Sequence, residues 1–124
     1  MWKPDPSIII TAEMKAAEAQ ASLRALIDDE RDRRIAGGFT FVGKRYQTRP
    51  EDRENIAGAS TAALAAVMNG AEAGNLRWHG GASDFFWIAE DNSLTPMDAT
   101  TMFAFGQSAM AHKQAVIFAA RART

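Results

Sequence analysis

The stretch LRWHGGASDFFWIAEDNSL, Leu76–Leu94, raises the question of whether it is an active site or a piece of sheet, because it combines aromatic, strand-like segments with a histidine, a serine and acidic residues. Residues 76–79 and 84–90 have the length and apolar content of strands, and the Gly-Gly sequence between them is typical of a turn. Asp91-Asn92 indicates a second turn before a short strand at 93–95. Pro96 cannot lie in a central strand and marks the exit. We therefore predict a small antiparallel meander over residues 76–95.

The same stretch contains the residue types of a nucleophilic site, namely Ser83, His79 and either Asp84 or Asp91. A catalytic triad needs these groups on separate elements and aimed at one point, whereas His79 and Ser83 flank a single tight turn. The chain has no G-x-S-x-G motif around this serine. Glu90 and Asp91 are adjacent and lack the opposed placement of a glycosidase pair. We expect no catalytic residue here and interpret the protein as non-enzymatic.

Metal and cofactor motifs are also missing from the sequence. The two histidines, His79 and His112, have no partner at ligand spacing. The run EDNS at 90–93 resembles the start of a calcium loop but lacks its glycine and terminal glutamate. The glycine pairs at 37–38 and 80–81 form neither a dinucleotide-binding nor a P-loop pattern. The sequence therefore predicts no metal site and no cofactor.

Helical patterns and a second hairpin signal surround the aromatic stretch. Apolar spacing, capping residues and glycine stops predict each boundary. The expected elements are a helix over 11–36, a hairpin over 39–48 with Gly43-Lys44 as its loop, a helix from the capping box Thr48–Glu51 to about Met68, and a helix capped by Asp98 that runs to about Arg121. The predicted fold class is α+β, with three helices and two small antiparallel β elements.

Apolar positions at helical spacing predict which face of each helix is buried. The expected core positions are Ala16, Ala19, Leu23, Leu26, Ile27 and Ile35 in the first helix, Ile56, Ala59, Ala63, Leu64 and Val67 in the second, and Met102, Phe105, Ala109, Val116 and Ala120 in the third.

Length and composition indicate one ordinary globular domain. The chain has 124 residues, a net charge of −1 and no cysteine, so it has no broad basic surface for nucleic acid and no disulfide framework. The N-terminal MWKPDPSIII lacks the pattern of a signal peptide, and no apolar run reaches the length of a membrane span. The two prolines favour an extended arm over residues 1–10, followed by a single domain over 11–124.

Aromatic residues are the best candidates for partner binding. Phe85, Phe86 and Trp87 are consecutive, so in a strand they face both sides of it. Either both faces are core, or one meets an oligomer or partner, since aromatic residues are enriched in both settings. Trp2 and the three isoleucines of the arm could likewise pack against their own chain or against a partner. The partner-binding candidates are Trp2, Ile8, Ile9, Ile10, Trp78, Phe85 and Trp87.

Several runs resemble a domain of unknown function that is common in tailed phages and prophages, particularly of alphaproteobacteria. The resemblance extends over about residues 20–123 and is most specific in RPEDRENI after the hairpin and in MDA before the last helix; the other matching runs are LRWHGG, FFWIAEDNSLTPMDATTMFAFG and AHKQAVIFAARA. Genes of this family typically lie near tail-fibre and tail-assembly genes.

The resemblance implies a setting and carries no catalytic residue with it. In that setting the protein is expected to be a non-enzymatic, accessory structural component of the tail or tail-fibre region, in the virion tail. Its partners would be other tail or tail-fibre proteins, with a homo-oligomer left open and neither nucleic acid nor a membrane span involved. An alternative is a transient assembly chaperone in the host cytoplasm. A tail-associated envelope hydrolase is the least favoured interpretation.

Overall fold

The computed structural model describes residues 11–124, in which three helices and two small sheets form the predicted α+β fold. The predicted arm over residues 1–10, with Trp2 and Ile8–Ile10, lies outside the described residues. The elements are α2 (Thr11–Ala36), β1 (Phe39–Phe41), β2 (Lys44–Tyr46), α3 (Pro50–Met68), β3 (Phe86–Ile88), β4 (Leu94–Pro96) and α4 (Ala99–Ala122). Both sheets are antiparallel pairs, β1 with β2 and β3 with β4.

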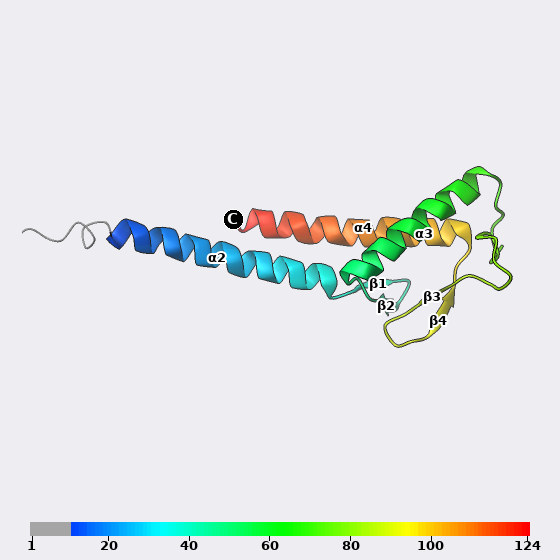
Figure 1. Cartoon of the computed structure of the whole chain (residues 1–124), viewed down its shortest axis with the longest axis horizontal. Coiled ribbons are helices and arrows are strands. Elements are labelled where there is room, and N and C mark those ends of the chain that lie inside the picture. The colour runs from blue at the N-terminus through cyan, green and yellow to red at the C-terminus, as the bar shows by residue number, and fades with distance from the viewer. Residues whose placement is uncertain (1–10) are drawn as a thin grey trace, which may run out of the picture.

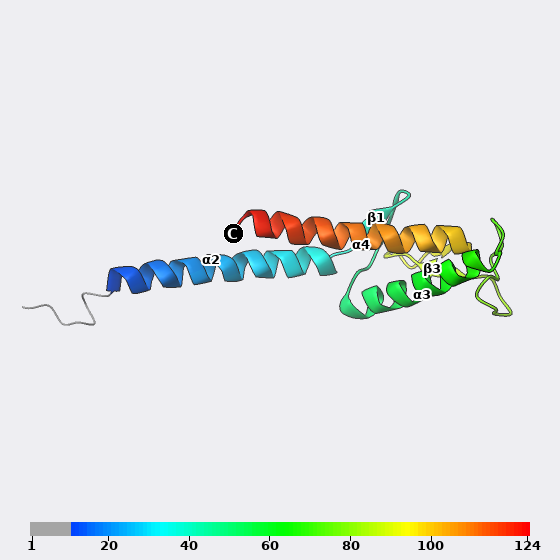
Figure 2. The ribbon, with the colours of Figure 1, turned by 90° about the horizontal axis from the view of Figure 1, so that it is seen from above.

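Helix α4 packs against both other helices and against β1. Figures 1 and 2 show α3 beside its N-terminal half and α2 running antiparallel to its C-terminal half. The two β pairs lie near the end where α3 and α4 meet (Figure 1). Because α2 continues beyond the end of α4, one end of the described chain is a single helix.

The core is centred on Phe105 of α4, whose side chain is completely buried. Its ring lies 4.8 Å from that of Tyr46, 5.3 Å from that of Phe39 and 5.6 Å from that of Trp87, measured between centroids. Aromatic pairs at these separations add attraction beyond the burial of their area. Phe105 therefore packs against residues of both β pairs and holds them against α4.

Thr48 joins the end of α2 to the start of α3. Its buried hydroxyl donates to the carbonyl oxygen of Ile35 at 2.6 Å and accepts the N–H of Gly38 at 2.8 Å. The predicted cap at Thr48 is therefore wrong by one residue, because this hydroxyl is used in tertiary bonds. Arg49 is the N-cap, and its N–H donates to the Asp52 carboxylate at 3.0 Å.

The hairpin loop is Val42-Gly43, one residue earlier than the predicted Gly43-Lys44. Phe41 pairs with Lys44, and both loop residues have positive φ, 49° and 80°. A two-residue loop of this kind matches the right-handed twist of the strands it connects. The register places Phe39 opposite Tyr46, so that both rings reach the core.

The predicted meander has two strands in place of three. Residues 76–79 form turns, and only one backbone bond, from Phe85 N–H to the Leu76 carbonyl, joins them to the following segment. The Trp78 indole N–H donates to the Met97 carbonyl at 3.0 Å, which fixes this segment by a side chain. Pro96 pairs with Phe86 in the two-stranded ribbon, where a missing N–H is tolerated at an edge.

Helix α2 buries only part of its predicted apolar face. Ile27 and Ile35 are buried, whereas Leu23 and Leu26 are 54% and 67% exposed, and Ala16 and Ala19 are exposed as well. The buried positions lie where α4 runs alongside, and the exposed ones lie at or beyond its end. Helix α4 begins after the predicted cap, since the Asp98 carboxylate accepts the N–H of Thr101 at 2.8 Å.

Candidate interaction surfaces

The acidic side chains of the aromatic stretch each have a local partner. Asp84 lies 3.4 Å from Arg77 and Glu90 lies 3.8 Å from Arg45. Asp91 accepts the hydroxyl and the N–H of Ser93 at 2.6 and 2.9 Å, and these bonds hold the pKa of its carboxyl below the ordinary value. These carboxylates close turns and bridge neighbouring strands.

The histidine of this stretch packs against aromatic rings and the glycine turn. The ring of His79 lies 5.2 Å from that of Phe85, and a β-carbon at Gly81 would overlap it. Within residues 11–124, no hydrogen bond joins His79 to Ser83, and no three histidine or acidic side chains are grouped as a metal site. His79 therefore packs against aromatic rings, and Asp84, Glu90 and Asp91 make local ion pairs or hydrogen bonds.

Three predicted partner-binding residues form one aromatic row under the β3–β4 ribbon. Trp78, Phe85 and Trp87 are half-buried, with centroids 4.8 Å apart between Trp78 and Phe85 and 6.2 Å apart between Phe85 and Trp87. All three pack against the buried cluster around Phe105. Their outer edges remain accessible, while their inner faces belong to the core.

The opposite face of the ribbon is apolar and open. Phe86, Ile88 and Leu94 are exposed, and the register places Ile88 opposite Leu94 and Phe86 opposite Pro96. The consecutive aromatic residues 85–87 therefore face two environments, as strand alternation requires, with Phe86 pointing away from the core.

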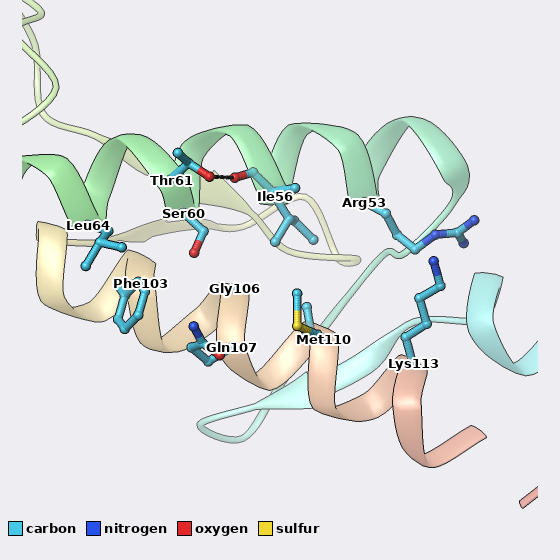
Figure 3. Close-up of a pocket in the computed structure, with 12 residues that line it drawn as sticks. Arg53, Ile56, Ser60, Thr61, Leu64, Phe103, Gly106, Gln107, Met110 and Lys113 are labelled. Carbon is cyan, nitrogen blue, oxygen red and sulfur yellow. Dashed lines mark hydrogen bonds between the residues drawn. The ribbon is translucent and has the colours of Figure 1, made fainter. Parts of the chain in front are cut away.

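Helices α3 and α4 enclose a groove of about 350 Å³ that the sequence patterns did not reveal (Figure 3). The helices approach closely at Ser60 and Gly106, where a β-carbon on the glycine would overlap the serine side chain. The lining of the groove is mostly apolar. It consists of Arg53, Ile56, Ala57, Ser60, Thr61, Leu64, Phe103, Gly106, Gln107, Ala109, Met110 and Lys113. Pockets of this size and composition are typical of binding sites.

Two cations mark one end of the groove. Figure 3 shows the side chains of Arg53 and Lys113 extending toward each other there, with Leu64 and Phe103 at the far end. Arg53 donates to the carbonyl oxygen of Thr48 at 2.7 Å, which holds its guanidinium in place. Among residues 11–124, neither cation has a carboxylate within ion-pair distance. The groove thus combines an apolar wall with a positive end.

The α2–α4 pair exposes large apolar side chains on its outer faces. Leu26 of α2 and Phe118 of α4 are 67% and 65% exposed, and Ile117 is partly exposed. Groups of exposed apolar side chains are typical of interaction sites, and each helix has such a group, Leu23 and Leu26 on α2 and Ile117 and Phe118 on α4. Sequence periodicity missed this surface because it predicts an apolar face without showing how far a neighbouring helix covers it.

No helix within residues 11–124 is both long and apolar enough to cross a membrane.

A comparison with known protein families gives a match over most of the chain. Residues 18–124 match the family model described as Domain of unknown function (DUF4376). No curated protein and no solved structure matches the chain. Because the match covers all of α3 and α4, both β pairs and most of α2, the chain belongs to the family Domain of unknown function (DUF4376).

Proposed function

We propose that the protein is a non-enzymatic, accessory structural component of a phage tail or tail-fibre region that acts through protein–protein contacts. The observation that carries this proposal is the set of exposed apolar side chains on the α2–α4 pair, Leu23 and Leu26 on α2 and Ile117 and Phe118 on α4. A helix pair that projects from the body of a protein gains stability when such side chains are covered by another chain. The phage setting comes from the resemblance of runs such as RPEDRENI and MDA to a tail-associated family.

The surface chemistry supports binding in preference to catalysis. The groove between α3 and α4 is lined mostly by apolar side chains and contains no acidic residue, and the acidic residues of Leu76–Leu94 are engaged in local bonds. A protein of this kind would bury apolar area on assembly and would contribute no reactive group.

Mass spectrometry of purified particles from the phage or induced prophage that encodes the chain tests this proposal. We expect the protein to be present at a fixed ratio to other tail proteins. The variant Leu26→Lys/Phe118→Lys should fold and be depleted from particles, because charge on both helices opposes burial. The control Gln20→Lys/Gln114→Lys adds the same charge at exposed polar positions of the same helices and should be incorporated normally.

The same exposed surface supports an assembly chaperone as the alternative. In that case the protein would be missing from mature particles, and its co-expression would raise the yield of soluble, correctly oligomerised fibre. A protein that is missing from particles and leaves this yield unchanged would contradict both functions.

A further inference from the structure

We propose that the groove between α3 and α4 receives the N-terminal half of α2 from a second copy of the chain. This inference deepens the proposed function by naming the partner of one surface, and it rests on that function only in requiring protein–protein contact. The occupying segment is residues 12–22, which lie in α2 and are exposed throughout.

This segment of α2 extends past the end of α4. Leu23 and Leu26 lie beside Arg123, the C-cap of α4, so residues 12–22 have no helix alongside them within the described chain. At 1.5 Å per residue, this overhang is roughly 16 Å long. The groove is lined along about three turns of each helix, from Arg53 to Leu64 on α3 and from Phe103 to Lys113 on α4, which is a similar length.

The overhang has the pattern that the groove requires. Met14, Ala17 and Ala21 have the spacing i, i+3 and i+7, so they form one narrow apolar strip. The small alanines allow close approach to a groove whose helices already meet at a glycine. Glu13 and Glu18 lie about 140° apart around the helix axis, one on each side of this strip.

Charges complete the match. Both glutamates of the overhang are exposed, and no ion pair within residues 11–124 involves either of them. Arg53 stands on the α3 wall of the groove and Lys113 on the α4 wall, both at the same end. A helix that enters with its N-terminal end at this position places one glutamate against each wall. Arg53 and Lys113 then each gain a carboxylate within ion-pair distance.

The segment cannot reach the groove of its own chain. Helix α2 is continuous from Thr11 to Ala36 and leads away from α3, so its overhang lies at the opposite end of the molecule (Figures 1 and 2). The occupant must therefore come from another copy.

Light scattering and sedimentation of the full-length protein over a range of concentrations test this contact. We expect reversible self-association that weakens with added salt. The variants Glu13→Lys/Glu18→Lys and Arg53→Glu/Lys113→Glu should each weaken it about tenfold or more, because attraction becomes repulsion. The variant with all four substitutions should regain it, since the charges are exchanged and the contact is preserved.

Two single substitutions serve as matched controls. Lys15→Glu changes the side of the overhang that faces away from the strip, and Arg121→Glu changes α4 outside the groove; both should leave association unchanged. Because Arg53 also bonds the Thr48 carbonyl, Lys113→Glu, alone and combined with Glu13→Lys/Glu18→Lys, repeats the test without that residue if Arg53→Glu/Lys113→Glu fails to fold.

Three outcomes would overturn the contact: a monomer at every concentration, a folded four-substitution variant that stays dissociated, or equal weakening by the two controls. Absence of the protein from phage particles would instead remove the proposed function and leave the association in solution unaffected.

Discussion

Gly106 of α4 lies directly against Ser60 of α3, so closely that a β-carbon at position 106 would overlap the serine side chain. The glycine has no role in a turn here, because it sits inside a continuous helix. Its effect is to let α3 and α4 meet at one point while the side chains on either side of that point line the groove.

Replacing Gly106 by alanine should therefore destabilise the protein by about 1–3 kcal/mol, since the added methyl group forces the two helices apart. Gly58→Ala, also inside a helix but facing open space, is the matched control and should stabilise by about 0.5–1 kcal/mol. Urea unfolding of both variants measures the difference. Equal effects of the two substitutions would contradict the close approach.

Thr48→Val should cost roughly 2 kcal/mol. The substitution keeps the shape of the side chain and removes the hydroxyl, which leaves the Gly38 N–H and the Ile35 carbonyl without their partner in a buried place. Thr61→Val removes a hydroxyl that bonds the Ala57 carbonyl on an exposed helix face, and it should change stability by less than about 0.5 kcal/mol. A small effect at position 48 would mean that the joint between α2 and α3 does not depend on this side chain.

Val42→Asn should stabilise the protein by about 1 kcal/mol. Val42 has a φ of 49°, which a β-branched residue adopts at a cost, and its side chain is 86% exposed, so little packing is lost. The change creates Asn-Gly, the pair preferred in this two-residue loop. Gly43→Val places a second branched residue at positive φ and should lower the thermal midpoint, whereas a higher midpoint would refute the loop conformation.

Protonation of Asp98 should weaken the start of α4. Hydrogen bonds from Thr101 and from the Gly74 N–H hold the pKa of its carboxyl below the ordinary value of 3.8. A lowered pKa in the folded state stabilises fully above the ordinary value and is lost as the pH falls through the lower one. The unfolding free energy should therefore fall between about pH 5 and pH 2, less steeply in Asp98→Asn. Asp29→Asn, at a position without a described hydrogen bond, should follow the parent chain.

Local signals in the sequence were enough for the helices and their order. Glycines after Ala36 and Met68 and the cap at Asp98 predict ends that the structure confirms to within a residue or two. Two of the errors arise where tertiary contacts overrule local preference. Thr48 is a residue type that commonly caps helices, but its hydroxyl bonds the Ile35 carbonyl of α2. Residues 76–79 have the composition of a strand, but they form turns and are fixed by the bond from the Trp78 indole to the Met97 carbonyl.

The interaction surfaces were only partly predictable for a related reason. Alternation along 85–87 correctly requires two faces, yet it could not show that Trp87 points inward and Phe86 outward, because that depends on the position of Phe105. The groove combines residues from two helices, and a periodic pattern in one helix does not report its neighbour. Leu23 and Leu26 were predicted to be buried, because the sequence of α2 does not indicate where the neighbouring helix α4 ends.

The offset between α2 and α4 along their axes makes the molecule directional. The overhang of residues 12–22 lies at one end of the molecule, and the groove between α3 and α4 lies toward the other. When the overhang of one copy occupies the groove of a second copy, one overhang and one groove remain vacant. Growth from such a contact either closes into a ring or continues as a filament whose tips differ, and the angle between successive copies alone decides which.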